Sequence, residues 1–176
     1  MSYEKILMDS TAVDRTLSRL AHQIIECNDS IKDICLIGVL RKGAPIANVL
    51  ARKIEQYSGI SVPTGKLDIS SHRDDLKIEQ QVNNTDIPFD IVGKTVILTD
   101  DVIYTGRTTR AAMDAIINIG RPAKIQLAVL IDRGHRELPI RGDYVGKNVP
   151  TSQSERILVK LSEAESDISV VLITDK

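Results

Sequence analysis

The stretch ILTDDVIYTGRTT, residues 97–109, is the most informative part of the sequence. It begins with apolar and β-branched residues and then places two carboxylates, Asp100 and Asp101, side by side. A short turn centred on Gly106 follows, and residues 108–120 have the apolar spacing of a helix that ends at Gly120. The chain therefore puts an acidic pair at the end of a buried strand, just before a turn and a helix.

The same alternation of strand and helix runs along most of the chain. Short apolar runs predict strands buried on both faces at residues 34–40, 94–101 and 123–131, and further β-like segments lie at 60–70, 156–161 and 168–173. Helical spacing follows Ser10 or Thr11 as the N-cap, and returns from about Pro45 to Gly59. This order predicts an α/β fold with a central parallel sheet flanked by helices.

Composition sets limits on the class of protein. The chain has 176 residues, 42% of them hydrophobic and 27% charged, which predicts a single domain over residues 1–176 with an aliphatic core. The formal net charge is −1 and the pI is about 6.3, so any binding of nucleic acid has to come from a local basic patch.

Several features point to the cytoplasm. The N-terminal residues MSYEKILMDSTAVDR lack the apolar core of a signal peptide, and no apolar run approaches the roughly 20 residues of a membrane span. Cys27 and Cys35 are too few for a disulfide framework and do not have metal-ligand spacing. We therefore expect a cytoplasmic protein that does not bind membranes and has two free thiols.

The turn after the acidic pair suits a phosphate. Successive backbone N–H groups and the N-terminus of the following helix can bind a dianion, and Gly106 allows close approach of the backbone. The acidic pair would repel phosphate but can accept hydrogen bonds from two neighbouring hydroxyls. Together these groups predict a ribose 5-phosphate site, although an Asp pair before a Thr-Gly turn can also be a simple helix cap. The stretch contains neither a P-loop nor a dinucleotide fingerprint.

The stretch closely resembles the signature of type I phosphoribosyltransferases, which bind 5-phosphoribosyl 1-pyrophosphate (PRPP). The second string, LAVLIDRGHRELPIRGDYVGKNVPTS, residues 127–152, resembles the PyrR family of pyrimidine operon attenuation regulators that also act as uracil phosphoribosyltransferases. The resemblance covers nearly the whole chain. It implies the type I phosphoribosyltransferase fold, with a flexible loop at about 70–90 and a small β-rich hood at about 132–150.

The reaction implied by the resemblance converts uracil and PRPP to UMP and diphosphate. Mg²⁺ would be held by PRPP and water, without a metal site of the protein's own, and Asp100, Asp101 and Arg73 would be catalytic. The resemblance implies that PRPP and UMP are bound by Arg41, Lys42, Ile97, Leu98, Thr99, Asp100, Asp101, Val102, Ile103, Tyr104, Thr105, Gly106, Arg107, Thr108, Thr109, Arg133 and Arg136. Tyr104 stands where purine enzymes of this type carry Asp, which favours uracil.

Two segments of the site are open to other interpretations. Arg41-Lys42-Gly43 stands where the type I enzymes usually have Thr-Arg-Gly in the pyrophosphate loop, and a Lys cannot make the bidentate contact of an Arg. Taken alone, these basic residues could be solvated surface. Residues 72–75, His-Arg-Asp-Asp, match the flexible lid of the family but could also be an ordinary polar loop.

The resemblance also implies a regulator that binds the leader of pyr mRNA, with UMP or UTP as effector. The residues implied in RNA binding are Arg15, Ser18, Arg19, His22, His135, Arg136, Arg141 and Lys147. The first four share one face of the predicted N-terminal helix, where charged residues are more often only solvated. A homodimer or larger homo-oligomer is also implied. The alternative is a phosphoribosyltransferase for a purine or orotate without RNA regulation.

Overall fold

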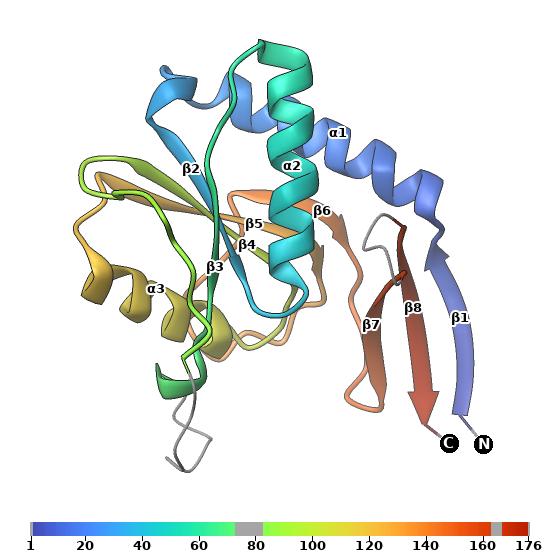
Figure 1. The fold of residues 1–176 in the computed structure, drawn as a ribbon. Coiled ribbons are helices and arrows are strands. Elements are labelled where there is room, and N and C mark those ends of the chain that lie inside the picture. Colours follow the sequence, from blue (N-terminus) through green and yellow to red (C-terminus); the bar gives the residue numbers. More distant parts are fainter. Residues whose placement is uncertain (1, 73–82, 163–166, 176) are drawn as a thin grey trace.

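The structure is a computed structural model that describes residues 2–72, 83–162 and 167–175 (Figure 1). Short 3₁₀ turns lie at Ile31–Asp33 and Ser70–His72. The other elements are, in chain order, β1 (Ser2–Met8), α1 (Ser10–Glu26), β2 (Ile34–Val39), α2 (Gly43–Ser58), β3 (Thr64–Leu67), β4 (Thr95–Ile103), α3 (Arg107–Ile119), β5 (Lys124–Asp132), β6 (Tyr144–Asn148), β7 (Glu155–Leu161) and β8 (Ile168–Asp175).

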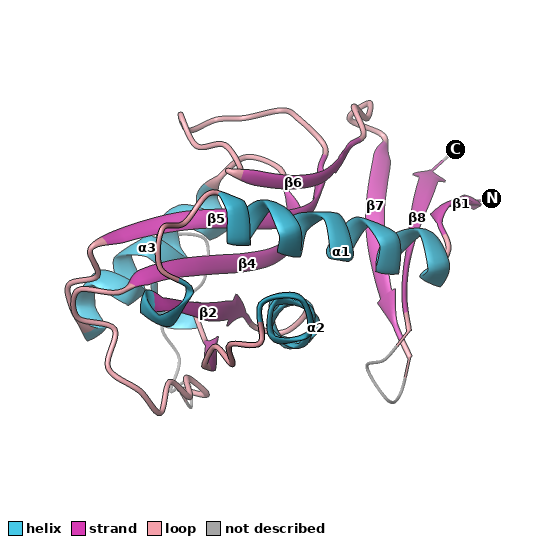
Figure 2. Cartoon of the chain, turned by 90° about the horizontal axis from the view of Figure 1, so that it is seen from above, coloured by secondary structure: helices cyan, strands magenta, loops and turns pink. Residues whose placement is uncertain are grey.

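The main sheet has five strands in the order β3-β2-β4-β5-β6, and all neighbouring strands are parallel. Helices α1 and α2 pack against one face and α3 packs against the other, so strands β2 and β4 lie in the core (Figure 1 and Figure 2). All six residues of β2 are buried, as are the first six of β4. This arrangement confirms the predicted α/β fold with a central parallel sheet.

The strand order reverses between β2 and β4. The chain leaves β2 toward α2 on one face and leaves β4 toward α3 on the other face. In open parallel sheets, loops that diverge in this way leave a crevice beyond the carboxyl ends of the two strands. The topology therefore puts the residues after β2 and β4 at the expected ligand position.

The helix boundaries differ slightly from those predicted. The N-cap of α1 is Asp9, whose Oδ1 accepts a hydrogen bond from the Ala12 backbone N–H at 2.8 Å, so Ser10 is already helical. Helix α2 begins at Gly43, two residues before the predicted Pro45, because Pro is tolerated in the first turn of a helix. It ends as predicted, with Gly59 in the left-handed region as its C-cap.

A second, antiparallel sheet has the strand order β1-β8-β7 and lies apart from the main sheet, with both chain termini at its end (Figure 1). The β-rich hood expected at about residues 132–150 stays a prediction, because the antiparallel sheet is not built from that range. Within that range β6 joins the parallel sheet beside β5, and the antiparallel sheet comes instead from the two ends of the chain. β1 and β6 were both absent from the predicted strands, because each is an edge strand with charged residues.

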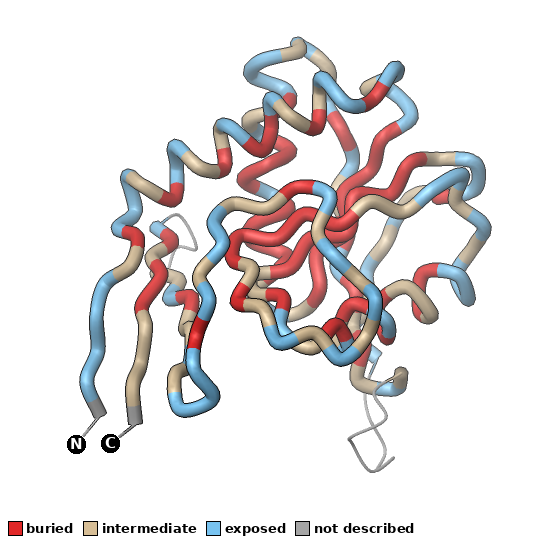
Figure 3. Tube along the Cα trace, turned by 180° about the vertical axis from the view of Figure 1, so that it is seen from behind, coloured by how far each residue is buried: buried red, intermediate tan, exposed pale blue. Residues whose placement is uncertain are grey.

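The buried residues form two mostly aliphatic clusters, one on each face of the main sheet. Figure 3 shows that buried positions gather along the central strands, while the outer loops are largely exposed. Helix α1 contributes Val13, Leu17, Leu20, Ala21 and Ile24, whose helical spacing puts them on one side of the helix. Among the residues that the structure describes, no helix is long and apolar enough to cross a membrane.

Candidate functional site

The two loops at the switch point enclose a cavity of about 390 Å³. Arg41 and Lys42 line it from the loop after β2, and Asp100 and Asp101 line it from the end of β4. Thr108, in the first turn of α3, also contributes. The Lys42 Nζ lies 3.9 Å from Asp101 Oδ2, so the cavity has a basic side facing an acidic side. The structure thus brings together the two segments that the sequence predicts to form one site.

Close backbone packing holds the basic loop against β4. The N-terminus of α2 lies so near β4 that a Cβ atom at Gly43 would collide with the Thr99 carbonyl oxygen. The peptide between Leu40 and Arg41 is cis, and the Leu40 N–H donates to Leu67 O of β3 at 2.9 Å. Gly43 therefore allows α2 to begin directly beside the acidic pair.

The acidic pair is built into the strand end. Asp100 is only 8% exposed, and its Oδ1 accepts a hydrogen bond from the Asp101 backbone N–H at 2.9 Å. Burial raises the pKa of Asp100 well above its usual range, and the negative charge of Asp101 adds to this effect, while Lys42 opposes it. A buried, ionised carboxylate is stabilised by a nearby cation or by hydroxyl groups that donate hydrogen bonds to it. A ribose diol would supply two such hydroxyl groups.

The turn after β4 has the geometry of an anion site. Gly106 has φ of 95° and is the N-cap of α3, and no side chain caps the helix there. The Arg107 N–H donates to Thr105 Oγ1 at 3.3 Å, and the following amides begin the helix. The N–H groups of the first turn of α3 and the positive end of its helix dipole favour a phosphate at this position.

Some residues predicted to bind PRPP lie in the core instead. Ile97, Leu98, Thr99, Ile103 and Thr109 have at most 4% of their surface exposed. Alternate side chains of β4 point to opposite faces of the sheet, and helices cover both faces. The side chains of these five residues are therefore buried beneath the site, so a ligand would meet their backbone, and their role in binding PRPP stays a prediction.

The loop after β5 is hydrogen-bonded to the turn at residues 104–107, which we call the phosphate turn because it is the predicted phosphate site. The N–H groups of Glu137 and Leu138 both donate to Thr105 O, at 3.0 and 3.2 Å. The Arg136 Nη1 donates to Tyr104 O at 2.9 Å, and its Nη2 lies 2.5 Å from Asp132 Oδ2. Any movement of the turn must therefore also move this loop or break these contacts.

Arg133 and Tyr104 form a stacked pair at the edge of the site. The Arg133 guanidinium carbon lies 3.9 Å from the centroid of the Tyr104 ring, while its Nε and Nη2 donate to Thr151 Oγ1 and Glu155 O. Arg133 is 9% exposed and Tyr104 is 37% exposed. Arg133 therefore supports the Tyr104 ring. A direct ligand contact by Arg133 or Arg136 remains a prediction.

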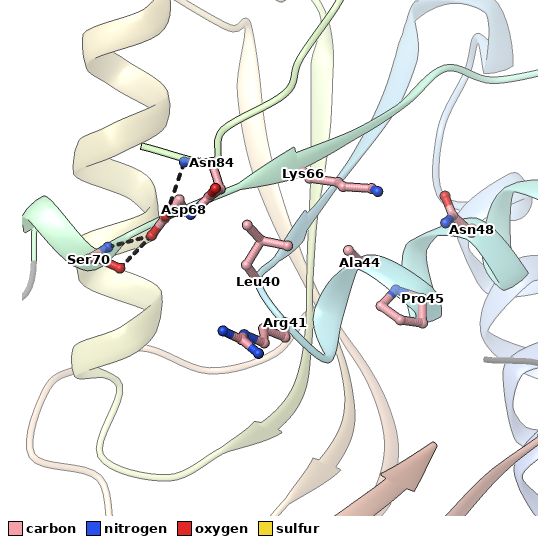
Figure 4. A pocket seen from close by; sticks show the side chains of 9 residues that line it. All are labelled: Leu40, Arg41, Ala44, Pro45, Asn48, Lys66, Asp68, Ser70 and Asn84. Atoms are coloured by element: carbon pink, nitrogen blue, oxygen red, sulfur yellow. Dashed lines mark hydrogen bonds between the residues drawn. The ribbon is translucent and has the colours of Figure 1, made fainter. Parts of the chain in front are cut away.

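A second cavity of about 480 Å³ adjoins the first, sharing Leu40, Arg41, Asp68 and Ser70 (Figure 4). Asp68 Oδ1 accepts hydrogen bonds from the Ser70 N–H and hydroxyl, and Oδ2 accepts two from Asn84. These bonds, with that of the Ser70 hydroxyl first, lower the pKa of Asp68 to about 2. We did not predict Asp68, although its spacing from Ser70 is typical of an Asx turn.

The segment between Ser70 and Asn84 is described only in part. Arg73, which the resemblance implies to be catalytic, lies outside the described residues, as do Asp74 and Asp75. His72 is described, and its Nε2 lies 3.1 Å from Asn118 Nδ2 on α3. The proposed lid over residues 70–90 therefore stays a prediction.

Most of the residues predicted to bind RNA fall into two places. Arg15, Ser18, Arg19 and His22 lie along α1, and the Arg19 Nη2 donates to Gly146 O at 2.5 Å, next to Lys147 on β6. By contrast, His135 and Arg136 lie beside the phosphate turn; the His135 ring contacts both Tyr104 and Thr151 O. Arg141 is exposed in the loop before β6. Arg19 thus connects α1 to β6, the strand that carries Lys147, while His135 and Arg136 lie at the turn of the predicted nucleotide site.

The residues of the cavity fit a magnesium ion that arrives with a diphosphate. In the described ranges, no group of three or more His, Cys, Asp or Glu side chains could hold a metal alone. Mg²⁺ is commonly held by one or two carboxylates together with substrate phosphates and water. Asp100 and Asp101 are suited to that partial role, and the cavity leaves the remaining ligands to the substrate.

A reversed strand order, an acidic pair and a helix N-terminus at one crevice are the features expected of a type I phosphoribosyltransferase. The sequence pattern of the phosphoribosyl transferase domain matches residues 5–164. A hypoxanthine-guanine phosphoribosyltransferase of Bacillus anthracis has the same fold, with a TM-score of 0.73 and 23% identity over 97% of this chain and 99% of the other.

Curated relatives narrow the class. The bifunctional protein PyrR of Chloroflexus aurantiacus is 52% identical over 176 residues, covering 98% of this chain and 97% of the relative. The bifunctional protein PyrR of Clostridioides difficile is 54% identical over 169 residues, covering 94% and 96%. The chain belongs to the phosphoribosyl transferase family and, within it, to the PyrR proteins.

Proposed function

We propose that the chain transfers the phosphoribosyl group of PRPP to uracil and also regulates pyr transcripts in the cytoplasm by binding RNA when a uridine nucleotide is bound. The observation that carries the first activity is the cavity between the two loops, because it has cations, an acidic pair and a phosphate turn around one space. These are the groups that a ribose 5-phosphate bearing a diphosphate requires.

In the proposed reaction, the bond from C1′ to the diphosphate oxygen breaks, a bond from C1′ to uracil N1 forms, and the N1 proton is released. The N–H groups after Gly106 would bind the 5′-phosphate, and Asp100 and Asp101 would accept from the ribose hydroxyls. Their negative charge would stabilise the positive charge that develops on the sugar. Arg41 and Lys42 would bind the leaving diphosphate, whose charge bound Mg²⁺ also neutralises.

The preference for uracil rests on Tyr104 and on the named relatives. Purine enzymes of this type carry Asp at the position of Tyr104, and here the ring is held by Arg133. The test is to incubate the protein with PRPP and Mg²⁺ and with uracil, hypoxanthine, xanthine or orotate in parallel. UMP formation from uracil alone is expected. Absence of UMP at high protein concentration, while a known uracil phosphoribosyltransferase works in the same assay, would overturn the proposal.

The regulatory activity is supported by the basic residues that gather along α1 and β6, where Arg19 contacts β6 beside Lys147. Lys and Arg side chains can bind RNA phosphates, and the unpaired bases of a hairpin loop can be read by hydrogen bonds and stacking. The PyrR relatives are named bifunctional. We infer that the nucleotide site is the effector site for UMP or UTP and that the protein acts as a homodimer or larger homo-oligomer.

Gel shifts with a hairpin from a pyr leader test this second activity. The affinity is expected to rise when UMP is added, and to be lower for a scrambled RNA of the same length. Equal binding of both RNAs, unaffected by UMP, would count against regulation while leaving the transferase activity untouched. Size-exclusion chromatography with light scattering measures the oligomeric state.

A further inference from the structure

Helices α1 and α2 carry paired side chains that the nucleotide cavity does not include. The Lys53 Nζ donates to Ser18 Oγ at 2.9 Å. Four residues further along both helices, the rings of His22 and Tyr57 stack with centroids 4.1 Å apart and an angle of 14° between their planes. The two contacts follow each other at one-turn spacing and join α1 to α2.

The His22–Tyr57 stack lies at the surface. Tyr57 is 37% exposed and His22 is also exposed, so water reaches both rings. The chain contains only five aromatic residues of the Phe, Tyr and Trp type, and it places one of them here outside the core. Stacking occupies one face of each ring, which allows a further flat group to extend the stack from the opposite face.

Cations lie along α1 beside this stack. Arg15 and Arg19 are seven and three residues before His22, on the same helical face, and both are exposed. Lys53 is different: its Nζ lies 2.7 Å from Asp14 and its side chain is only 12% exposed, so it holds the two helices together. Flat aromatic rings flanked by exposed arginines are the combination that single-stranded nucleic acids bind.

We propose that the His22–Tyr57 stack is a platform on which an unpaired RNA base stacks. This inference rests on the proposed RNA-binding function and extends it from α1 onto α2. It assigns a role to Tyr57, which is not among the residues predicted from the sequence, while Lys53 positions the platform without contacting the RNA.

The test compares two variants at Tyr57 using a pyr leader hairpin with 2-aminopurine in its loop, in the presence of UMP. Tyr57→Leu keeps an apolar side chain but removes the ring, and its affinity is expected to fall about five- to hundredfold. Tyr57→Phe keeps the ring and is expected to bind like the wild type. Tyr3→Leu, at a tyrosine that is 63% exposed on β1, is the matched control and should also bind like the wild type.

Two further readouts separate stacking from a loss of structure. Quenching of the 2-aminopurine fluorescence is expected with the wild type and with Tyr57→Phe, and is expected to be lost with Tyr57→Leu. The slope of log affinity against log salt should be unchanged by Tyr57→Leu, because stacking does not displace counterions, whereas Arg19→Gln should lower it. Circular dichroism and thermal melting establish that each variant is folded.

The outcomes are distinct. If Tyr57→Leu binds the hairpin with the same affinity as the wild type, the proposed platform is overturned. The proposed RNA-binding function would then still hold. Weak binding by Tyr57→Phe as well as Tyr57→Leu, with quenching retained, would also overturn it, because the ring would then not be what the RNA contacts. Failure of the wild-type protein to bind the hairpin at all would overturn the RNA-binding function itself, and the platform with it.

Discussion

Arg107 and Glu137 form an ion pair in which the Arg107 Nε lies 2.8 Å from Glu137 Oε2. The pair joins the first residue of α3 to the loop after β5, which also carries His135 and Arg136. Thr105 O accepts two backbone hydrogen bonds from the same loop. A nucleotide phosphate at the turn would therefore change the surroundings of a loop that is predicted to contact RNA. The Arg107–Glu137 ion pair therefore offers a physical route by which bound UMP could change the affinity for RNA.

Glu137→Gln is expected to weaken this coupling. Because both side chains are about half exposed, the pair contributes at most about 1 kcal/mol to stability, so the fold should be retained. We expect RNA affinity without UMP to stay within about twofold of wild type, and the increase caused by UMP to become smaller. Titration of RNA binding with and without UMP measures both values and gives the coupling free energy directly.

Asp114→Asn is the matched control for this variant, because it removes an exposed ion pair with Arg110 elsewhere on α3. Its response to UMP should equal that of the wild type. If Glu137→Gln also responds to UMP like the wild type, the ion pair does not carry the coupling.

Asp100→Asn is expected to stabilise the protein while impairing catalysis. The pKa of Asp100 is raised in the folded state, so its contribution to stability is present below about pH 4 and is lost as the pH rises through the folded-state value. An Asn cannot ionise and avoids this loss, so the variant should melt a few degrees higher than the wild type at pH 7 to 8, with the difference shrinking at pH 4.

The same variant should lower kcat/KM for PRPP by about a hundredfold, because one charge that stabilises the transition state is lost. Initial rates and melting curves from pH 4 to 8 measure the two effects. If Asp100→Asn melts at a lower temperature than the wild type at pH 8, the ionised Asp100 carboxylate does not destabilise the unliganded protein.

The position of the site could be predicted because its signals are local. Residues 97–109 contain a strand, an acidic pair, a turn and a helix start in one continuous stretch, and a strand buried on both faces leaves a clear apolar run. Strand β6 was missed because YVGKN, residues 144–148, is short and polar, and only its pairing with β5 makes it a strand.

Contacts between distant parts of the chain were beyond sequence reasoning. Strand β1 pairs with β8, with Ser2 opposite Asp175, and neither segment indicates this partner. Arg133 and Arg136 were predicted as ligand contacts because they are basic and lie in the matching string. Their hydrogen bonds to the surrounding backbone depend on where the loop folds, which residue types alone do not reveal.

Asp68→Asn tests the Asp68 carboxylate, which accepts hydrogen bonds from both Ser70 and Asn84 at the rim of the second cavity. An amide cannot replace a carboxylate that accepts from both residues, so we expect a loss of about 1–3 kcal/mol in unfolding free energy at pH 7. The pKa of Asp68 is lowered from 3.8 to about 2, so its contribution is present above about pH 4 and is lost as the pH falls toward 2.

Urea unfolding at pH 7 and at pH 3 measures this difference, which should be smaller at the lower pH. Asp86→Asn is the control, since Asp86 is exposed and its pairing with Lys66 is made by the backbone. An equal loss of unfolding free energy in both variants would mean that the hydrogen bonds of the Asp68 carboxylate do not stabilise the fold.

The two cysteines should differ sharply in reactivity. Cys27 is exposed after α1, whereas Cys35 lies in β2 with none of its surface exposed, and burial raises its pKa to about 11. At pH 8 only about one in a thousand Cys35 thiols would be ionised, and the reagent could not reach it. A disulfide reagent such as DTNB should therefore modify one thiol per native chain rapidly, and Cys27→Ser should abolish that phase. In urea both thiols should react, because unfolding exposes β2. Two rapid thiols in the native wild-type protein would contradict the close packing of α3 against this strand.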